Sequence, residues 1–165
     1  GSRLGHVKHA PPVFRALVYN KGAAVLHMLR RLLGDEVFFR GLRRFYMDRR
    51  YQKAGTEDFE RAMEAESGRV LDRFFERWIY GGGIPRVRYG TQIGDKQVVV
   101  KFEQAGDQVF DIPVTVTLTY ADGRTSNVVV PISDSQVERS IPTEGSVRRV
   151  QINQDSAALA EFVEG

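Results

Sequence analysis

The sequence predicts an α+β fold, with helices in the first half of the chain and antiparallel strands in the second. From about Val13 to Tyr80 the apolar residues recur at intervals of three and four, which is typical of amphipathic helices. After the run GGGIP at Gly81–Pro85 the apolar period changes to two, as in half-buried strands. The chain has 165 residues, of which 42% are apolar, enough for one ordinary domain or two small ones. We therefore expect four short helices followed by a small β-sandwich.

Capping residues and apolar stripes divide the first half into its helices. Gly34 is expected to end the first helix because glycine readily adopts the left-handed conformation, and Asp35 is expected to cap the second. Thr56 is expected to cap the third helix, and Gly68 separates it from the fourth, VLDRFFERWIY. The stripes of the first two helices consist of Val25, Met28, Leu29, Leu32 and Leu33, and of Val37, Phe38, Leu42, Phe45 and Tyr46.

The second half contains six or seven alternating or β-branched segments bounded by turn residues. Asp122-Gly123 is the clearest hairpin signal, because this dipeptide readily supplies positive φ. Pro113 and Pro131 lack a backbone donor, so they are expected at sheet edges or strand ends. The closing segment SAALAEFV is predicted to be a short helix packed on the sandwich edge.

The glycine run is the expected boundary between two units. Gly1-Ser2 looks like an expression scar, so we do not expect Arg3 to be a natural start, and an intact protein is expected to have further sequence upstream. The predicted division is an expression scar and linker (1–12), a helical part (13–83), a β-sandwich (84–155) and a terminal helix or tail (156–165).

Several kinds of catalytic site are excluded by the residues present. The chain has no cysteine, which rules out disulfides, thiolate nucleophiles and cysteine-ligated zinc. It has no HExxH motif, serine nucleophile elbow or phosphate-binding loop, and no apolar run as long as a membrane span. His6 and His9 have the i, i+3 spacing of a metal pair but lack a third ligand, so an exposed pair is favoured. His27 is expected at the surface or interface of a helix.

The positive charge of the chain is unevenly distributed. The net charge is +3, but the segment from Arg30 to Lys53 holds eight cations against three acids. Such a cluster could bind nucleic acid or anionic lipid. A solvated face of amphipathic helices is favoured, because charge runs are usually surface and arginine stems cover apolar residues.

The most informative stretch, VYNKGAAVLHML, begins at Val18 and contains Tyr19 as its second residue. The sequence places Tyr19 at the head of a helix, and the small residues Gly22, Ala23 and Ala24 would let a backbone or ligand approach. Taken alone, this pattern favours a structural tyrosine whose ring fills a core.

The quoted stretch and five others carry a family resemblance. VYNKGAAVLHML, LGDEVFFRGLRRFY, TEDFERAMEAESG and LDRFFERWIYGGGIP, followed by a β-rich part with FDIPVTV and VQIN, closely resemble the downstream part of the alanyl-aminopeptidase family of zinc peptidases. These gluzincins include leukotriene hydrolase. The resemblance is specific from about Phe14 to Pro85 and weaker to Asn153. It implies the four-helix end of a catalytic domain followed by a β-sandwich.

The resemblance implies a catalytic role for Tyr19. The family's tyrosine in Tyr-x-Lys-Gly donates a hydrogen bond to the oxyanion formed when water attacks the scissile carbonyl, and Lys21 and Gly22 complete this motif. A helix N-terminus at Tyr19 would add a favourable dipole. The family's zinc ligands, general-base glutamate and exopeptidase motif lie upstream of the matching region and are absent from this chain. We therefore expect a zinc-dependent parent enzyme, and a fragment that is inactive and has neither metal ligands nor cofactor-binding residues of its own.

The expected partners follow from the same resemblance. They are the upstream catalytic domain of the same parent chain and, in that parent, a peptide substrate; nucleic acid is not expected. Truncation would also leave apolar patches that drive self-association. The alternative function is a non-catalytic, peptidase-like scaffold that binds proteins or polyanions. Nothing in these residues indicates a cellular location.

Overall fold

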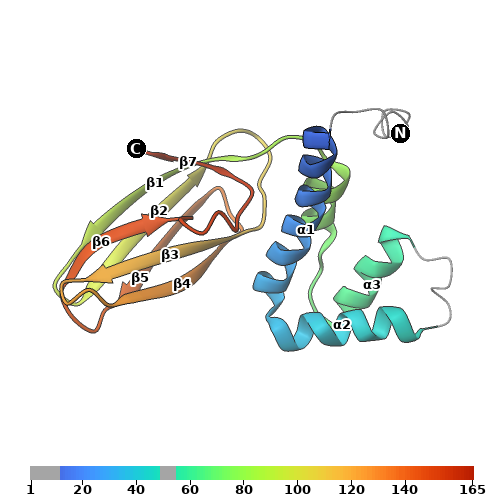
Figure 1. The fold of residues 1–165 in the computed structure, drawn as a ribbon, viewed down its shortest axis with the longest axis horizontal. Coiled ribbons are helices and arrows are strands. Elements are labelled where there is room, and N and C mark those ends of the chain that lie inside the picture. The colour runs from blue at the N-terminus through green and yellow to red at the C-terminus, as the bar shows by residue number, and fades with distance from the viewer. Residues whose placement is uncertain (1–11, 49–54) are drawn as a thin grey trace.

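The computed structural model describes residues 12–48 and 55–165, with side chains from residue 21 onward. It confirms the α+β fold: the helices lie at one end of the molecule and a two-sheet sandwich at the other (Figure 1). None of the described helices is both long and apolar enough to cross a membrane. The described helical segments are α1 (Pro12–Leu33), α2 (Asp35–Met47), α3 (Thr56–Ser67), α4 (Asp72–Phe75) and the π-helical turn η3 (Glu76–Tyr80).

The sandwich consists of a four-stranded and a three-stranded sheet. The first has the order β5-β2-β1-β7 and the second the order β4-β3-β6. All neighbouring pairs are antiparallel except β1 and β7, which are parallel. The strands are β1 (Arg86–Ile93), β2 (Gln97–Gln104), β3 (Ile112–Tyr120), β4 (Thr125–Ile132), β5 (Gln136–Pro142), β6 (Val147–Ile152) and β7 (Glu161–Glu164).

The predicted closing helix is wrong, because the end of this segment forms strand β7. The free edge of β1 offers unpaired backbone groups, and pairing with them outweighs the weak helical pattern of SAALAEFV. The backbone N–H of Glu161 donates to the carbonyl of Pro85 at 2.9 Å, and that of Gly165 donates to Tyr89 at 3.0 Å. Asn153 holds the preceding loop by accepting the N–H of Ala158 at 3.0 Å.

The turn glycines are confirmed, whereas the caps lie one residue earlier than predicted. Gly34 and Gly68 have φ of 87° and 67°, a region that strains residues with a Cβ. Gly34 itself is the N-cap of α2, because the helix begins at Asp35, whose carboxylate accepts from Arg30 at 2.7 Å. Gly55, and not Thr56, is the N-cap of α3.

The two prolines lie where their missing N–H groups do little harm. Pro113 is the second residue of β3 and pairs with Pro131, which lies near the end of β4. β4 is also an edge strand of its sheet, so the prediction of edge or strand-end positions is confirmed.

One apolar core runs from the helices into the sandwich. Trp78 is buried, and its ring meets that of Phe110 edge-on with the centroids 4.9 Å apart. Its indole N–H also donates to the carbonyl of Asp111 at 2.9 Å. Next to it, the guanidinium of Arg73 donates to both carboxylate oxygens of Asp111 at 3.1 and 2.6 Å. On α1, Arg31 donates to the carbonyl of Pro113 at 3.0 Å. The helices are therefore fixed against the start of β3.

Candidate functional site

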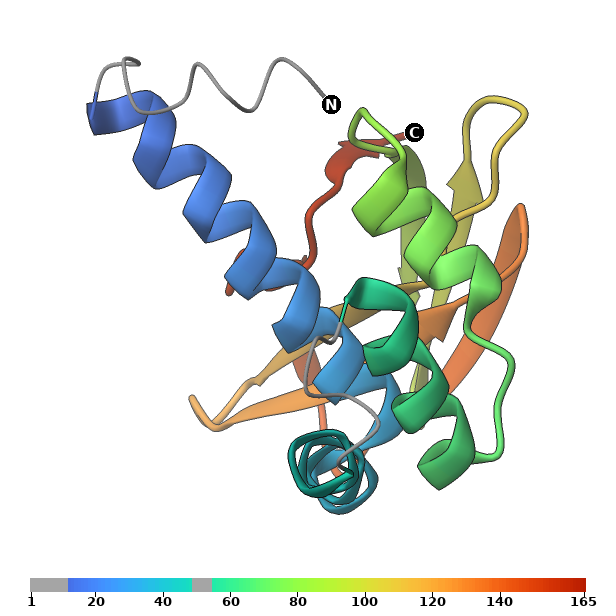
Figure 2. The same cartoon turned by 90° about the vertical axis from the view of Figure 1, so that its right-hand side faces the viewer.

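An apolar groove of about 750 Å³ opens among α1, α2, α3 and η3. Figure 2 looks onto the side of the molecule where these helices lie. The buried residues Val25 and Trp78 belong to its lining, whereas Leu26, Tyr46 and Ile79 remain 43%, 79% and 37% exposed. Exposed apolar side chains around a concavity are typical of a binding surface. The lining residues are Lys21, Gly22, Val25, Leu26, Leu42, Phe45, Tyr46, Gly55, Thr56, Phe59, Trp78 and Ile79.

The π-helical turn η3 forms one wall of the groove. π-Helical turns inside helices occur frequently at functional sites. Gly81 follows the turn. A Cβ added at Gly81 would lie 2.8 Å from the carbonyl oxygen of Arg77 and 2.9 Å from that of Glu76. The backbone can therefore fold back tightly after Trp78 and Ile79, which keeps both residues on the groove.

The structure corrects the expected position of Tyr19. Helix α1 begins at Pro12, so Tyr19 lies inside the helix and not at its head. A helix dipole acts mainly within the first turn, so the expected dipole contribution at Tyr19 is also wrong. The side chain of Tyr19 lies outside the described part of the chain. Lys21 and Gly22, which follow it in the motif, line the groove.

Of the three histidines, the structure describes the side chain of His27. His27 is exposed on α1, as the sequence predicts for a surface position. His6 and His9 lie outside the described residues, so their predicted exposure stays a prediction.

Within the part of the chain that the structure describes, the potential ligands do not fit a catalytic zinc site. The chain has no HExxH motif, and within the described residues the close group of potential ligands is Glu60, Glu64 and Asp72. Zinc in peptidases is held by at least one imidazole besides carboxylate, with an open position for water. A set of three carboxylates lacks the imidazole, so no catalytic step at a metal follows from this chain.

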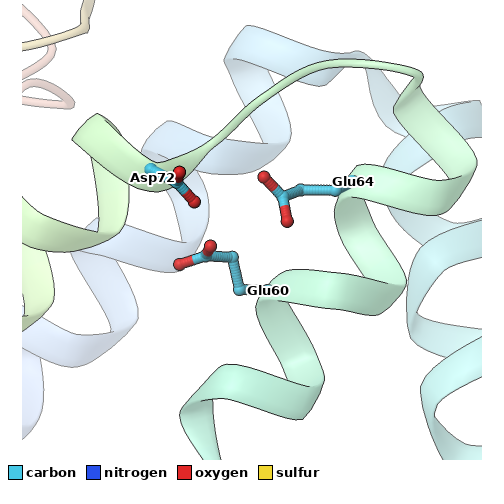
Figure 3. Close-up of side chains that lie close together, drawn as sticks. All are labelled: Glu60, Glu64 and Asp72. Atoms are coloured by element: carbon cyan, nitrogen blue, oxygen red, sulfur yellow. The ribbon is translucent and has the colours of Figure 1, made fainter.

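The three carboxylates are nonetheless an unusual electrostatic feature. Their oxygens lie within 4.8 Å of one another and point together (Figure 3). Burial, a hydrogen bond with Asp72 and the charge of Glu64 raise the pKa of Glu60 to about 7. Sequence reasoning missed this cluster, although the like charges of Glu60 and Glu64 at i, i+4 were a signal.

The arginine-rich segment makes local ion pairs. Arg30 contacts Asp35 at 2.7 Å, and Arg40 and Arg44 both contact Glu66, at 3.3 and 3.1 Å. The guanidinium of Arg44, together with that of Arg40, lowers the pKa of Glu66. These pairs fit the solvated face that the sequence favours, because they leave less unbalanced positive charge for a polyanion.

Comparison with known proteins supports the same family as the sequence motifs. Residues 2–78 match the family described as "Peptidase family M1 domain". Aminopeptidase N from Lactococcus lactis subsp. lactis is 33% identical over 89 residues, which are 54% of this chain and 10% of the relative. Tricorn protease-interacting factor F2 from Thermoplasma volcanium is 30% identical over 120 residues, which are 73% of this chain and 13% of the relative.

A solved structure shows the same fold. The crystal structure of Legionella pneumophila aminopeptidase A in complex with aspartic acid superposes with a TM-score of 0.71 and 18% identity, covering 87% of this chain and 17% of that one. The sequence and fold together identify the chain as a member of the alanyl-aminopeptidase, or M1, family of gluzincin peptidases. It spans 10% and 13% of the length of the two curated relatives above.

Proposed function

We propose that this chain forms one wall of the active-site cleft of a zinc-dependent aminopeptidase and supplies Tyr19 as a transition-state hydrogen-bond donor. The observation that carries the proposal is the position of the Tyr-x-Lys-Gly motif: Lys21 and Gly22 line the apolar groove, and Tyr19 lies less than one turn before them on α1. In a helix, positions 19, 22 and 26 share one stripe, and Gly22 and Leu26 both belong to the groove lining.

A tyrosine suits this role chemically. Its phenol is neutral at pH 7 and donates a hydrogen bond, which stabilises an oxygen that becomes negative in the transition state. Because α1 does not begin at Tyr19, the donor would act through its hydroxyl alone and not through a helix dipole.

The zinc ligands and the general base are proposed to come from the preceding part of the parent chain. This chain contains neither, so on its own it would not hydrolyse peptides by this route. The exposed Leu26, Tyr46 and Ile79 support the proposal, since the upstream catalytic domain and a bound peptide would bury them. In the isolated chain the same side chains would favour self-association. The β-sandwich would serve as a spacer or dock.

The alternative, a non-catalytic scaffold for proteins or polyanions, has less support. Binding of a polyanion would require free positive charge, whereas Arg30, Arg40 and Arg44 have acidic partners. An HExxH motif upstream in the parent reading frame would favour the enzyme, and its absence would favour the scaffold.

The Tyr19→Phe variant of the intact parent protein tests the proposed donor. Loss of one oxyanion donor is expected to lower kcat for aminoacyl arylamides by roughly 10²- to 10³-fold with little change in KM. Tyr89→Phe, which removes a phenol from β1 in the sandwich, is the matched control and should leave kcat unchanged. Unchanged turnover in Tyr19→Phe would make Tyr19 a core residue. A parent without any turnover would support the scaffold.

A further inference from the structure

The carboxylate cluster joins two helices that follow each other in the chain. Glu60 and Glu64 lie one turn apart on α3, and Asp72 is the first residue of α4. The carboxylate of Glu64 also accepts the backbone N–H of Leu71 at 2.8 Å, just before α4 begins. The cluster therefore holds the start of α4 against the side of α3 (Figure 3).

The charged groups that shift the pKa of Glu60 are all acidic, and no cation is among them. Two nearby arginines have partners outside the cluster: Arg69 donates to the carbonyl of Leu32 at 3.0 Å, and Arg73 contacts Asp111 at 2.6 Å. On α2, Arg40 and Arg44 contact Glu66. Glu57 on α3 adds a further negative charge toward Glu60. Three carboxylates this close, without a cation, are more stable with a proton among them than fully ionised.

We propose that Glu60, Glu64 and Asp72 form a proton-dependent latch between α3 and α4. With Glu60 protonated, its carboxyl donates to Asp72 and Glu64 remains on the N–H of Leu71, so the two helices are held together. When the proton leaves, three negative charges face one another and the junction loosens. The raised pKa of Glu60, caused first by burial and then by Asp72, supports this behaviour near neutral pH.

The latch is connected to the groove through both helices. Phe59, next to Glu60 on α3, lines one wall of the groove, and α4 continues through η3 to Trp78 and Ile79 on another. A change in the α3–α4 junction would therefore shift two groove walls relative to each other. The inference concerns this chain alone and does not depend on catalysis.

The direction of the pH effect follows from proton linkage. The folded chain holds the proton of Glu60 up to about pH 7, whereas the unfolded chain releases it near the ordinary value of 4.5. The stabilisation is therefore complete below pH 4.5 and is lost as the pH rises through 7. A hydrogen bond from Arg30 lowers the pKa of Asp35, and one from Arg44 is the main cause that lowers the pKa of Glu66. These two carboxylates therefore stabilise the folded chain at neutral pH, and this stabilisation is lost only in acid. Between pH 5 and 8, Asp35 and Glu66 therefore contribute little to any change in stability, and the effect of Glu60 can be measured separately.

Denaturant unfolding of this chain at pH 5 and pH 8 tests the latch. Unfolding is monitored by the fluorescence of Trp78, the single tryptophan. The unfolding equilibrium constant of the wild type is expected to rise at least about tenfold between the two pH values, the equivalent of one pKa unit. In Glu60→Gln, which cannot ionise, this rise should disappear. Contributions that are the same in both proteins cancel in this comparison. Glu76→Gln, an exposed carboxylate on η3, is the matched control and should behave as the wild type.

An identical pH dependence in wild type and Glu60→Gln would overturn the latch. A second measurement covers the case that the variant fails to fold: the carboxyl carbon of Glu60 is titrated by NMR in the folded wild type. A midpoint well above 4.5 supports the latch, and a midpoint near 4.5 overturns it.

Discussion

Gln104, the last residue of β2, shows how one buried amide can organise a loop of this protein. Its Nε2 donates to the carbonyl of Phe110 at 2.8 Å, and its Oε1 accepts the N–H of the same residue at 2.9 Å. The side chain thus replaces a strand partner for Phe110, whose ring packs on Trp78. Sequence periodicity assigns no such role to a polar residue at a strand end.

The Gln104→Leu variant is expected to lower the free energy of unfolding by about 2 kcal/mol, because it leaves the buried N–H and carbonyl of Phe110 without partners. Denaturant unfolding measures this loss. Gln97→Leu, at the exposed start of the same strand, is the control and should change stability by less than about 0.5 kcal/mol. Equal losses in both variants would contradict the proposed role of the amide.

Among the secondary-structure elements, η3 and the glycines after it connect the helices to the sandwich. The sequence predicts the end of the helix here, because three glycines and Pro85 disfavour helical geometry. It does not distinguish the glycines, whereas the structure does. Gly81 faces two backbone carbonyls, Gly82 faces open space, and Gly83 has φ of 92°.

Alanine substitutions should therefore have unequal effects. Gly81→Ala is expected to destabilise the chain by about 1–3 kcal/mol, since its Cβ would overlap backbone atoms that cannot move aside. Gly82→Ala is the matched control and should be neutral within about 0.5 kcal/mol. Thermal unfolding followed by circular dichroism compares the two. Similar losses would mean that flexibility, and not close backbone approach, requires glycine at both positions.

At the level of the whole molecule, polar contacts and a shared core hold the helices on the sandwich. Arg73 reaches from α4 to Asp111 and also donates to the carbonyl of Ser133 at 2.7 Å. Arg31 reaches from α1 to Pro113 and Thr115. Such contacts between distant segments determine how the groove is oriented relative to the sheets.

Arg73→Met tests this connection. It removes two hydrogen bonds from the largely buried Asp111, and the expected loss of stability is about 1 kcal/mol after allowing for partial exposure of the arginine. Arg124→Met breaks a comparable pair with Asp122, but within a single exposed hairpin, and should therefore destabilise the chain less than Arg73→Met does. Denaturant unfolding followed by Trp78 fluorescence measures both. A larger loss in Arg124→Met would show that the Arg73 contact does not hold the two parts together.

Local sequence patterns predict the four helices, the alternating strands and the left-handed glycines Gly34 and Gly68. They do so because helix and strand periods, turns and caps depend on residues a few positions apart. The same local reasoning placed Tyr19 at the head of α1, although the helical apolar period runs from about Val13, and the helix begins at Pro12.

Longer-range features required the folded chain, because they depend on groups far apart in sequence. Strand β7 exists because the distant edge of β1 offers backbone partners, although its own sequence resembles a helix. Asp72 meets Glu60 and Glu64 only in the folded chain, where burial and then Asp72 raise the pKa of Glu60. Fold class and family therefore follow from short-range patterns, whereas the groove and the shared proton arise from tertiary packing that brings separate elements within contact distance.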